Sequence, residues 1–279
     1  MVVTSPFSGE YLGSFFKRNS FLVGREFSTK DFDVIVVGEG CYEYGEGVEI
    51  IHAHLEELIE HHTLMPVARK IGLRALCGFP LMSRFNFFIC PACVFEDYQV
   101  IGTPIIHLKH MVGRVTHCGK HGLMLLAKCP ACHVNVARHN LPKLLKCMEL
   151  EYPSIVEDFS EVGSAYSKFV QDMLELDSPE VLSTEARGII RAKLSTLGYS
   201  VVGGVDMQRI AAVITRDYPQ FQNLKSTWKN NDMDYYLILI FFAYGSARLY
   251  LDDLGNLRGR LKIPQFPSQS WRDYLRYLS

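Results

Sequence analysis

The sequence predicts a mainly α-helical protein that carries small zinc-binding modules of the zinc-knuckle or ribbon type. Six of the eight cysteines lie between residues 90 and 147, and four of them form pairs with two residues between the cysteines. Apolar residues elsewhere recur at helical spacing. The 279 residues, 48% of them hydrophobic and 21% charged, suffice for two domains of ordinary size. We expect an N-terminal domain over residues 1–150, with a zinc-finger region at about 86–150, and a helical C-terminal domain over residues 151–279.

The N-terminal part is expected to begin without a targeting signal and to contain one helix. Residues 1–16 lack the basic and apolar regions of a secretory signal, so we expect a location in the cytoplasm, where cysteines stay reduced. Apolar residues at i, i+3 and i+4 predict a helix from Val48 to Leu64. Pro66 then marks the end of this helix or a kink.

Charge is distributed unevenly along the chain. Residues 1–60 contain four Lys and Arg against eleven Asp and Glu, a net charge of −7. Residues 61–150 contain eleven against three, a net charge of +8, and residues 151–279 contain fourteen against sixteen, a net charge of −2. The basic middle segment indicates a surface for phosphates or an acidic partner, and its candidate contact residues are Lys120, Lys128, Arg138, Lys143 and Lys146. Alternatively, the acidic N-terminal segment packs beside it.

The strongest motif is formed by two short ligand pairs. Cys90-Pro-Ala-Cys93 and Cys118-Gly-Lys-His121 each place two metal-binding side chains in a pair with two residues between them. Such a turn directs both side chains at one ion, and a second turn completes the tetrahedron that structural Zn²⁺ prefers. Four protein ligands leave no position for water, so we expect a structural site and no catalysis at this metal.

A second zinc site is predicted at Cys129-Pro-Ala-Cys132, with Cys147 as the third ligand. A matching knuckle requires Cys or His at position 150, where the chain has Leu150. The fourth ligand is then His133, His139 or a nearby carboxylate. The alternative of a thioredoxin-like redox pair is disfavoured because no βαβ pattern surrounds these cysteines.

The C-terminal half shows two predicted helices separated by a glycine turn. Ser183 is placed to cap a helix that ends at Gly198, and residues 199–202 form a short strand or wing. Asp206 then caps a second helix that ends before Pro219. This order resembles a helix-turn-helix over about residues 183–225, with Arg209, Arg216 and Lys225 as candidate nucleic-acid contacts. The alternative is an ordinary helical bundle with solvated charges.

A strongly apolar helix is predicted from Trp228 to Leu251, at the core of the C-terminal half. Its longest apolar run, Tyr235 to Tyr244, is about half of the ~20 residues that a membrane span requires. We therefore expect a buried helix and no membrane association. The same half is a candidate surface for self-association as a homodimer.

A family resemblance follows from the order of these motifs. Cys90-Pro-Ala-Cys93, Gly102, His110, Cys118-Gly-Lys-His121-Gly122, Leu125 and Cys129-Pro-Ala-Cys132 together resemble the TniQ/TnsD family of transposon target-selection proteins. The opening residues Pro6, Glu10, Leu12 and Ser14 and the segment 62–66 also resemble this family, as does the helical extension downstream. Leu150 departs from its pattern.

The resemblance implies a non-catalytic targeting factor in DNA transposition. Such proteins recruit a AAA+ transposition regulator, which then recruits the transposase. TniQ-type members dock on an RNA-guided CRISPR effector complex, whereas larger TnsD-type members recognise an attachment site in the target DNA. Because this chain is short and its net charge is −1, we expect an adaptor of the first kind, with a sequence-specific DNA-binding selector as the alternative.

Overall fold

The computed structural model describes residues 5–23, 60–73, 87–148, 161–178, 181–221 and 233–261. Helices dominate this part of the chain, which confirms the mainly α-helical prediction. The α-helices are α1 (Leu12–Val23), α5 (Met65–Lys70), α6 (Pro91–Ile101), α7 (Leu141–Met148), α9 (Glu161–Glu175), α10 (Ser183–Thr196), α11 (Met207–Asp217), α12 (Met233–Tyr244) and α13 (Ala247–Leu261). The described residues also form two short strands and two 3-10 turns, η1 (Leu108–His110) and η2 (Pro219–Phe221).

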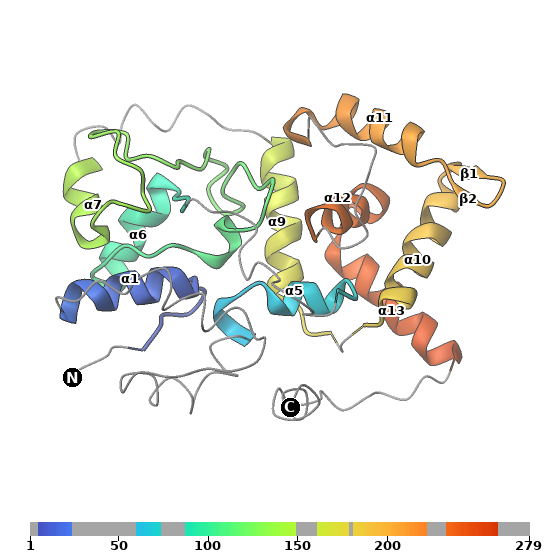
Figure 1. Ribbon diagram of the computed structural model, residues 1–279, viewed down its shortest axis with the longest axis horizontal. Helices are drawn as coiled ribbons and strands as arrows, with labels where there is room; N and C mark the ends of the chain where they lie inside the picture. The colour runs from blue at the N-terminus through green and yellow to red at the C-terminus, as the bar shows by residue number, and fades with distance from the viewer. Residues whose placement is uncertain are drawn as a thin grey trace, which may run out of the picture.

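Helix α9 lies in the middle of the molecule and contacts elements from both predicted domains. In Figure 1, α1, α6 and α7 lie on one side of α9 and helices α10 to α13 lie on the other. Helix α9 packs against α5 and η1 on the first side and against α12 and α13 on the second. One hydrophobic core therefore runs through both sides, from Tyr11 near the N-terminus to Leu254 in α13.

The opening segment is held by a buried polar network around Glu10. The Glu10 carboxylate is fully buried and accepts hydrogen bonds from Ser14 Oγ (2.9 Å) and Arg18 Nη2 (2.9 Å). Ser14 Oγ in turn accepts from the Ile106 backbone N–H (2.9 Å), and His62 Nδ1 lies 2.7 Å from the Glu10 carbonyl oxygen. Buried charges require such partners, so these residues fix α1 to the segment that follows α6.

Part of the predicted N-terminal helix lies outside the described residues. Of the range Val48 to Leu64, residues 60–64 are described: residues 60–62 are helical, and Thr63 and Leu64 form a bend. Helix α5 begins at Met65 with Pro66 in its first turn, where the missing N–H of proline costs nothing. The acidic N-terminal segment, residues 1–60, is the alternative cover for the basic segment, and its residues 24–59 also lie outside the described residues.

The region of the predicted helix-turn-helix contains two capped helices joined by a β-hairpin. Helix α10 begins at Ser183, but its N-cap is Leu182, whose backbone N–H donates to the Glu185 carboxylate (2.7 Å). Glu185 thus acts as the N3 glutamate that accepts from the N-cap N–H, and the prediction of Ser183 as the cap is wrong because Ser183 is already the first helical residue. Asp206 caps α11 as predicted and accepts from the Arg209 backbone N–H (3.0 Å).

The connection between α10 and α11 differs from a helix-turn-helix turn. Strands β1 (Ser200–Val201) and β2 (Gly204–Val205) pair antiparallel, so ten residues, 197–206, separate the helices instead of about three or four. Helix α10 packs against α12 and α13. The hairpin confirms the short strand or wing that was predicted at residues 199–202. The helix-turn-helix stays a prediction. Lys225 lies outside the described residues.

The apolar helix predicted from Trp228 to Leu251 is interrupted. Helix α12 ends at Tyr244 and α13 begins at Ala247, because Gly245 adopts a left-handed backbone (φ 66°). This part of the prediction is wrong, although Tyr235 to Tyr244 is helical and mostly buried as expected. None of the described helices has the length and apolar character needed to cross a membrane.

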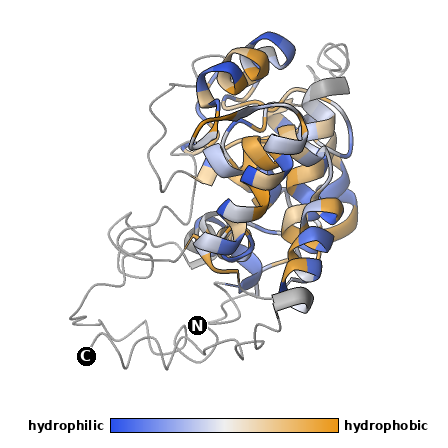
Figure 2. Ribbon diagram, turned by 90° about the vertical axis from the view of Figure 1, so that its right-hand side faces the viewer, coloured by the Kyte–Doolittle hydropathy of each residue, from blue (hydrophilic) through white to orange (hydrophobic). Residues whose placement is uncertain are grey.

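Aromatic side chains fill the core where α9 meets α12. The rings of Tyr166 and Phe241 are 5.2 Å apart at their centroids, and Phe221 lies 4.8 Å from Tyr166. Viewed from the side of α10 and the hairpin, the helices carry both hydrophobic and hydrophilic stripes (Figure 2). The apolar stripes of α9 and α11 thus supply buried residues such as Met173 and Ile214 to this core.

Helix α9 also docks closely on the segment that contains Cys118. Ser167 Oγ donates a hydrogen bond to the His117 carbonyl oxygen (2.5 Å). A Cβ atom on Gly163 would lie 2.2 Å from His117 Nδ1, so only glycine fits at this contact. The cysteine-containing segment and the helical half are therefore in direct contact through one face of α9.

We predict that Gly163→Ala destabilises the protein by about 1–3 kcal/mol, because the added methyl group overpacks the contact with His117. Gly188→Ala is the matched control, since Gly188 also lies within a helix but has nothing within 4 Å of the added atom. The control should stabilise by about 0.5–1 kcal/mol. Urea unfolding measures both changes, and equal effects of the two substitutions would contradict the contact.

Candidate metal centres

The first ligand pair forms the N-terminal turn of α6. Cys90 is the N-cap residue, Pro91 occupies the next position, and Cys93 lies one turn into the helix. Proline is suited to this position because the first helical N–H groups have no intrahelical partner. Both sulfur atoms therefore lie at the positive end of the helix dipole, which favours thiolates.

The second pair lies in a tight turn that faces the first. The Cys118 N–H donates to the Leu123 carbonyl (2.8 Å), and the Gly122 N–H donates to the Cys118 carbonyl (2.7 Å). The turn closes because Gly122 adopts a left-handed backbone (φ 69°). Ile89 and Leu126 exchange two backbone hydrogen bonds, so the chain before Cys90 is joined to the chain after this turn.

These two turns bring four donor atoms together. His121 Nδ1 lies 3.4 Å from the sulfur atoms of Cys90 and Cys93 and 3.6 Å from that of Cys118. The sulfur atoms of Cys93 and Cys118 are 3.7 Å apart. A tetrahedral zinc ion, with Zn–S of about 2.3 Å and Zn–N of about 2.0 Å, separates its donors by roughly 3.5–3.8 Å. The predicted set Cys90, Cys93, Cys118 and His121 is thus a cluster that could hold a metal ion.

Proton sharing within this cluster also fits a cation. Hydrogen bonding to Cys118 raises the pKa of Cys90 to about 12 and raises the pKa of Cys93 still further. The same contacts with Cys90 and Cys93 hold the pKa of Cys118 far below its ordinary value. A divalent cation bound by the cluster would replace the protons that these sulfur atoms share.

Glu96 orients the histidine ligand from outside the cluster. Its Oε1 atom lies 3.0 Å from His121 Nε2, and its Oε2 atom accepts from Lys120 Nζ (2.6 Å). A carboxylate on the distal nitrogen fixes the ring and leaves Nδ1 to the metal. Lys120, predicted as a contact for phosphates or an acidic partner, is exposed but is paired in this way with Glu96.

The second cluster repeats the backbone of the first. The Cys129 N–H donates to the Val134 carbonyl (2.9 Å), and the His133 N–H donates to the Cys129 carbonyl (2.9 Å). His133 therefore occupies the place of Gly122 and has a left-handed backbone (φ 58°), which is uncommon for a residue with a side chain. Its side chain is not among the donors of this cluster.

The fourth donor of the second cluster is His139. Cys129, Cys132, His139 and Cys147 have ligand atoms within 4.8 Å of one another, so they also could hold a metal ion. His139 Nδ1 lies 2.9 Å from the Asn140 carbonyl oxygen, which leaves Nε2 available to a metal. Helix α7 carries Cys147 and packs against α6, and the sulfur atoms of Cys129 and Cys147 are 3.5 Å apart.

The two clusters differ in their access to solvent. Cys90, Cys93 and Cys118 are buried, whereas Cys132 of the second cluster is exposed and Cys147 is half-buried. The second cluster is therefore open to solvent on one side. Sequence spacing identified every cysteine of both clusters but left the choice between His133 and His139 open, and it gave no sign of Glu96.

Exposed basic residues surround the second cluster. Lys128, Arg138, Lys143 and Lys146 are exposed, and Lys143 and Lys146 share one face of α7 because they are three residues apart. Residues 87–148 contain seven Lys and Arg against two Asp and Glu, a net charge of +5. The two acidic residues are engaged, Glu96 as described and Asp97 with His107 (3.0 Å).

The candidate basic residues of α11 have partners within the helix and its preceding turn. Arg216 forms two hydrogen bonds with Asp217, at 2.6 and 3.1 Å. The Arg209 guanidinium lies 5.2 Å from the centroid of the Tyr199 ring and donates to the Gly198 carbonyl oxygen (3.3 Å). Both side chains are exposed, but the charge of Arg216 is largely offset.

We predict that His139→Ala lowers the metal content of purified protein from two ions per chain to one, because it removes a donor of the second cluster. His133→Gly is the matched control: it should keep two ions and leave stability equal or higher, since glycine adopts the left-handed backbone without strain. Elemental analysis by mass spectrometry measures both. Loss of metal in the His133 variant with retention in the His139 variant would overturn the assignment.

A second expectation concerns Glu96. Glu96→Ala should weaken metal binding at the first cluster by about 10- to 100-fold, the usual effect of losing a partner of a metal-bound histidine. Lys120→Met, which keeps the carboxylate, is the control and should change the affinity little. Competition with a chromophoric chelator gives the affinities, and equal values for Glu96→Ala and the unaltered protein would show that Glu96 does not orient His121.

Comparison with known proteins bears on neither cluster. No protein-family model matches the chain. No curated protein matches its sequence. The function of the protein therefore has to be argued from the two clusters and the surface around them.

Proposed function

We propose that both clusters hold structural Zn²⁺ and that the protein is a non-catalytic target-selection adaptor in DNA transposition. The observation that carries this proposal is the pair of Cys₃His donor sets, one at residues 90–121 and one at residues 129–147. Thiolate and imidazole donors in a tetrahedron favour zinc. The resemblance to the TniQ/TnsD family includes six of these eight residues, Cys90, Cys93, Cys118, His121, Cys129 and Cys132. The chemistry of the sites supports zinc, and the resemblance supports the role in transposition.

A structural role follows from the number of donors. Catalytic zinc keeps a position for water beside three protein ligands, whereas each of these clusters supplies four donors. Binding of zinc to such sites contributes roughly 10–16 kcal/mol that is coupled to folding. The zinc ions would thus hold residues 87–148 in a fixed shape that presents their surface to partners.

The surface presented by this module is basic. A zinc ion with three thiolates carries a net charge of −1, so two such sites reduce the charge of residues 87–148 from +5 to about +3. Lys128, Arg138, Lys143 and Lys146 are exposed and have no ion pair within the described part of the chain. They are suited to phosphates of target DNA or guide RNA, or to acidic side chains of a partner protein.

We infer from this arrangement that the zinc module contacts a target-marking complex, such as an RNA-guided effector on its DNA, while another surface binds the AAA+ regulator. The second candidate function is a sequence-specific selector that reads an attachment site through a helix-turn-helix-like unit. Its support is α11, which is capped by Asp206 and exposes Arg209 and Arg216. Sequence-specific readers need several base contacts, and the pairing of Arg216 with Asp217 favours the adaptor.

We predict that replacing Lys128, Arg138, Lys143 and Lys146 together by Gln weakens binding to an effector loaded on DNA. The loss of each phosphate contact should make the negative slope of log affinity against log salt concentration shallower by about 0.9 for duplex DNA. Replacement of Arg209 and Arg216 by Gln tests the alternative. Fluorescence anisotropy with the loaded effector, random duplex and a candidate attachment-site duplex provides the measurement.

The two functions give opposite results in this experiment. An adaptor binds the loaded effector more tightly than either duplex and loses this binding in the four-residue variant. A selector binds the attachment-site duplex at least ~10³-fold more tightly than random duplex and loses this discrimination in the α11 variant. Selective binding to one duplex without the effector would contradict the adaptor.

A further inference from the structure

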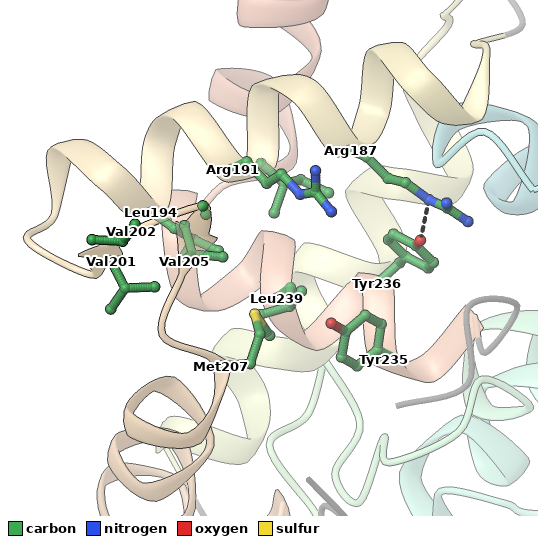
Figure 3. Close-up of a pocket in the computed structure, with 13 residues that line it drawn as sticks. Arg187, Arg191, Leu194, Val201, Val202, Val205, Met207, Tyr235, Tyr236 and Leu239 are labelled. Atoms are coloured by element: carbon green, nitrogen blue, oxygen red, sulfur yellow. Dashed lines mark hydrogen bonds between the residues drawn. The ribbon is translucent and has the colours of Figure 1, made fainter. Parts of the chain in front are cut away.

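A groove of about 570 Å³ lies between α10, the β1–β2 hairpin and α12. This volume is in the range of sites that bind a small ligand or a few side chains. Figure 3 shows Arg187 and Arg191 projecting from α10 above Tyr235 and Tyr236 of α12, with the hairpin valines at the other end. The groove is thus cationic at one end and apolar at the other.

The cationic end contains two arginines, which differ in their hydrogen bonding. Arg187 and Arg191 are four residues apart on α10 and share a face of the helix. Arg187 Nε donates to Tyr236 Oη (2.7 Å), and its guanidinium lies 5.9 Å from the ring centroid. Arg191 is exposed and has no hydrogen bond or ion pair with the described residues, while no Asp or Glu lines the groove.

Tyr235 adds a hydrogen-bond donor to this end. Burial holds the pKa of Tyr235 well above its ordinary value, so its hydroxyl stays protonated at neutral pH. A carboxylate placed here could accept from the guanidinium of Arg191 and from this hydroxyl. The geometry of the arginine pair and the hydroxyl is therefore suited to an anionic group.

The apolar end continues onto an exposed surface. Leu194, Val205 and Leu239 line the groove there, and the hairpin tip beside them exposes Val202 completely and Val201 by half. Exposed apolar side chains next to a groove are typical of protein-binding sites. They can pack against apolar side chains of a partner protein. The phosphate backbone of a nucleic acid offers no such apolar groups.

We propose that this groove binds a short acidic segment of a partner protein, with an Asp or Glu on Arg191 and a neighbouring apolar side chain at the hairpin end. The two guanidiniums are complementary to a carboxylate, and the apolar hairpin favours a protein segment over nucleic acid, because apolar side chains of a partner can pack against Val201 and Val202. Binding of such a segment does not depend on the transposition function proposed above and goes beyond it.

The test is a selection of random displayed 12-residue peptides against the zinc-loaded full chain. Enriched peptides should carry Asp or Glu within a few residues of Leu, Ile, Val or Phe. Arg191→Glu should weaken the best peptide about tenfold or more, as expected for loss of a charge-assisted hydrogen bond. Arg248→Glu is the matched control, since Arg248 is exposed on α13 and does not line the groove, and it should leave the affinity unchanged.

Two further measurements complete the test. Val202→Ser, at the fully exposed tip, should weaken the same peptide by about two- to threefold while circular dichroism stays that of the unaltered protein. A duplex oligonucleotide should not displace the peptide. The proposal is overturned if enriched peptides lack acidic residues, if Arg191→Glu and Arg248→Glu act equally, or if the oligonucleotide displaces the peptide.

Discussion

The convergence of Cys90, Cys93, Cys118 and His121 on one tetrahedron is the constraint on which the rest of the structure depends. The segment between α6 and α7 contains one 3-10 turn and isolated backbone pairs, so its regular hydrogen bonds are few. A chain of this kind needs another source of order to offset its conformational entropy. Two metal ions, each held by four donors from separate turns, would supply that order and would fix the basic residues on the same module.

The helical half depends on this module through α9. Ser167 bonds to the His117 carbonyl, Gly163 leaves room for the His117 ring, and the opposite side of α9 packs its aromatic residues against α12. The segment that contains the first metal cluster is therefore joined to the core of the helical half through one helix. This coupling suits an adaptor, because the basic module and the groove beside α10 are held in a fixed relation to each other.

The sequence predicted the role of a residue correctly where spacing along the chain determines that role. It did not where the local backbone conformation or a tertiary contact determines it. The spacing with two residues between ligands identified both cysteine pairs and His121, because a turn that directs two side chains at one ion requires this spacing. The choice of His139 over His133 depended on a left-handed backbone at His133, which spacing does not reveal. The division of the apolar helix at Gly245 and the use of Leu182 as N-cap likewise arose from local backbone geometry, and the partners of Glu96 arose from tertiary contact.

The central claim is that two Cys₃His sites hold zinc with four protein ligands each and no bound water. X-ray absorption at the zinc edge tests it most directly. The expected spectrum has an average of three sulfur atoms at about 2.3 Å and one nitrogen at about 2.0 Å around each zinc, with two zinc ions per chain. The exposed Cys132 makes the second site the more demanding case. An oxygen ligand at either zinc, or fewer than three sulfur atoms per zinc on average, would show an open site and contradict the structural role.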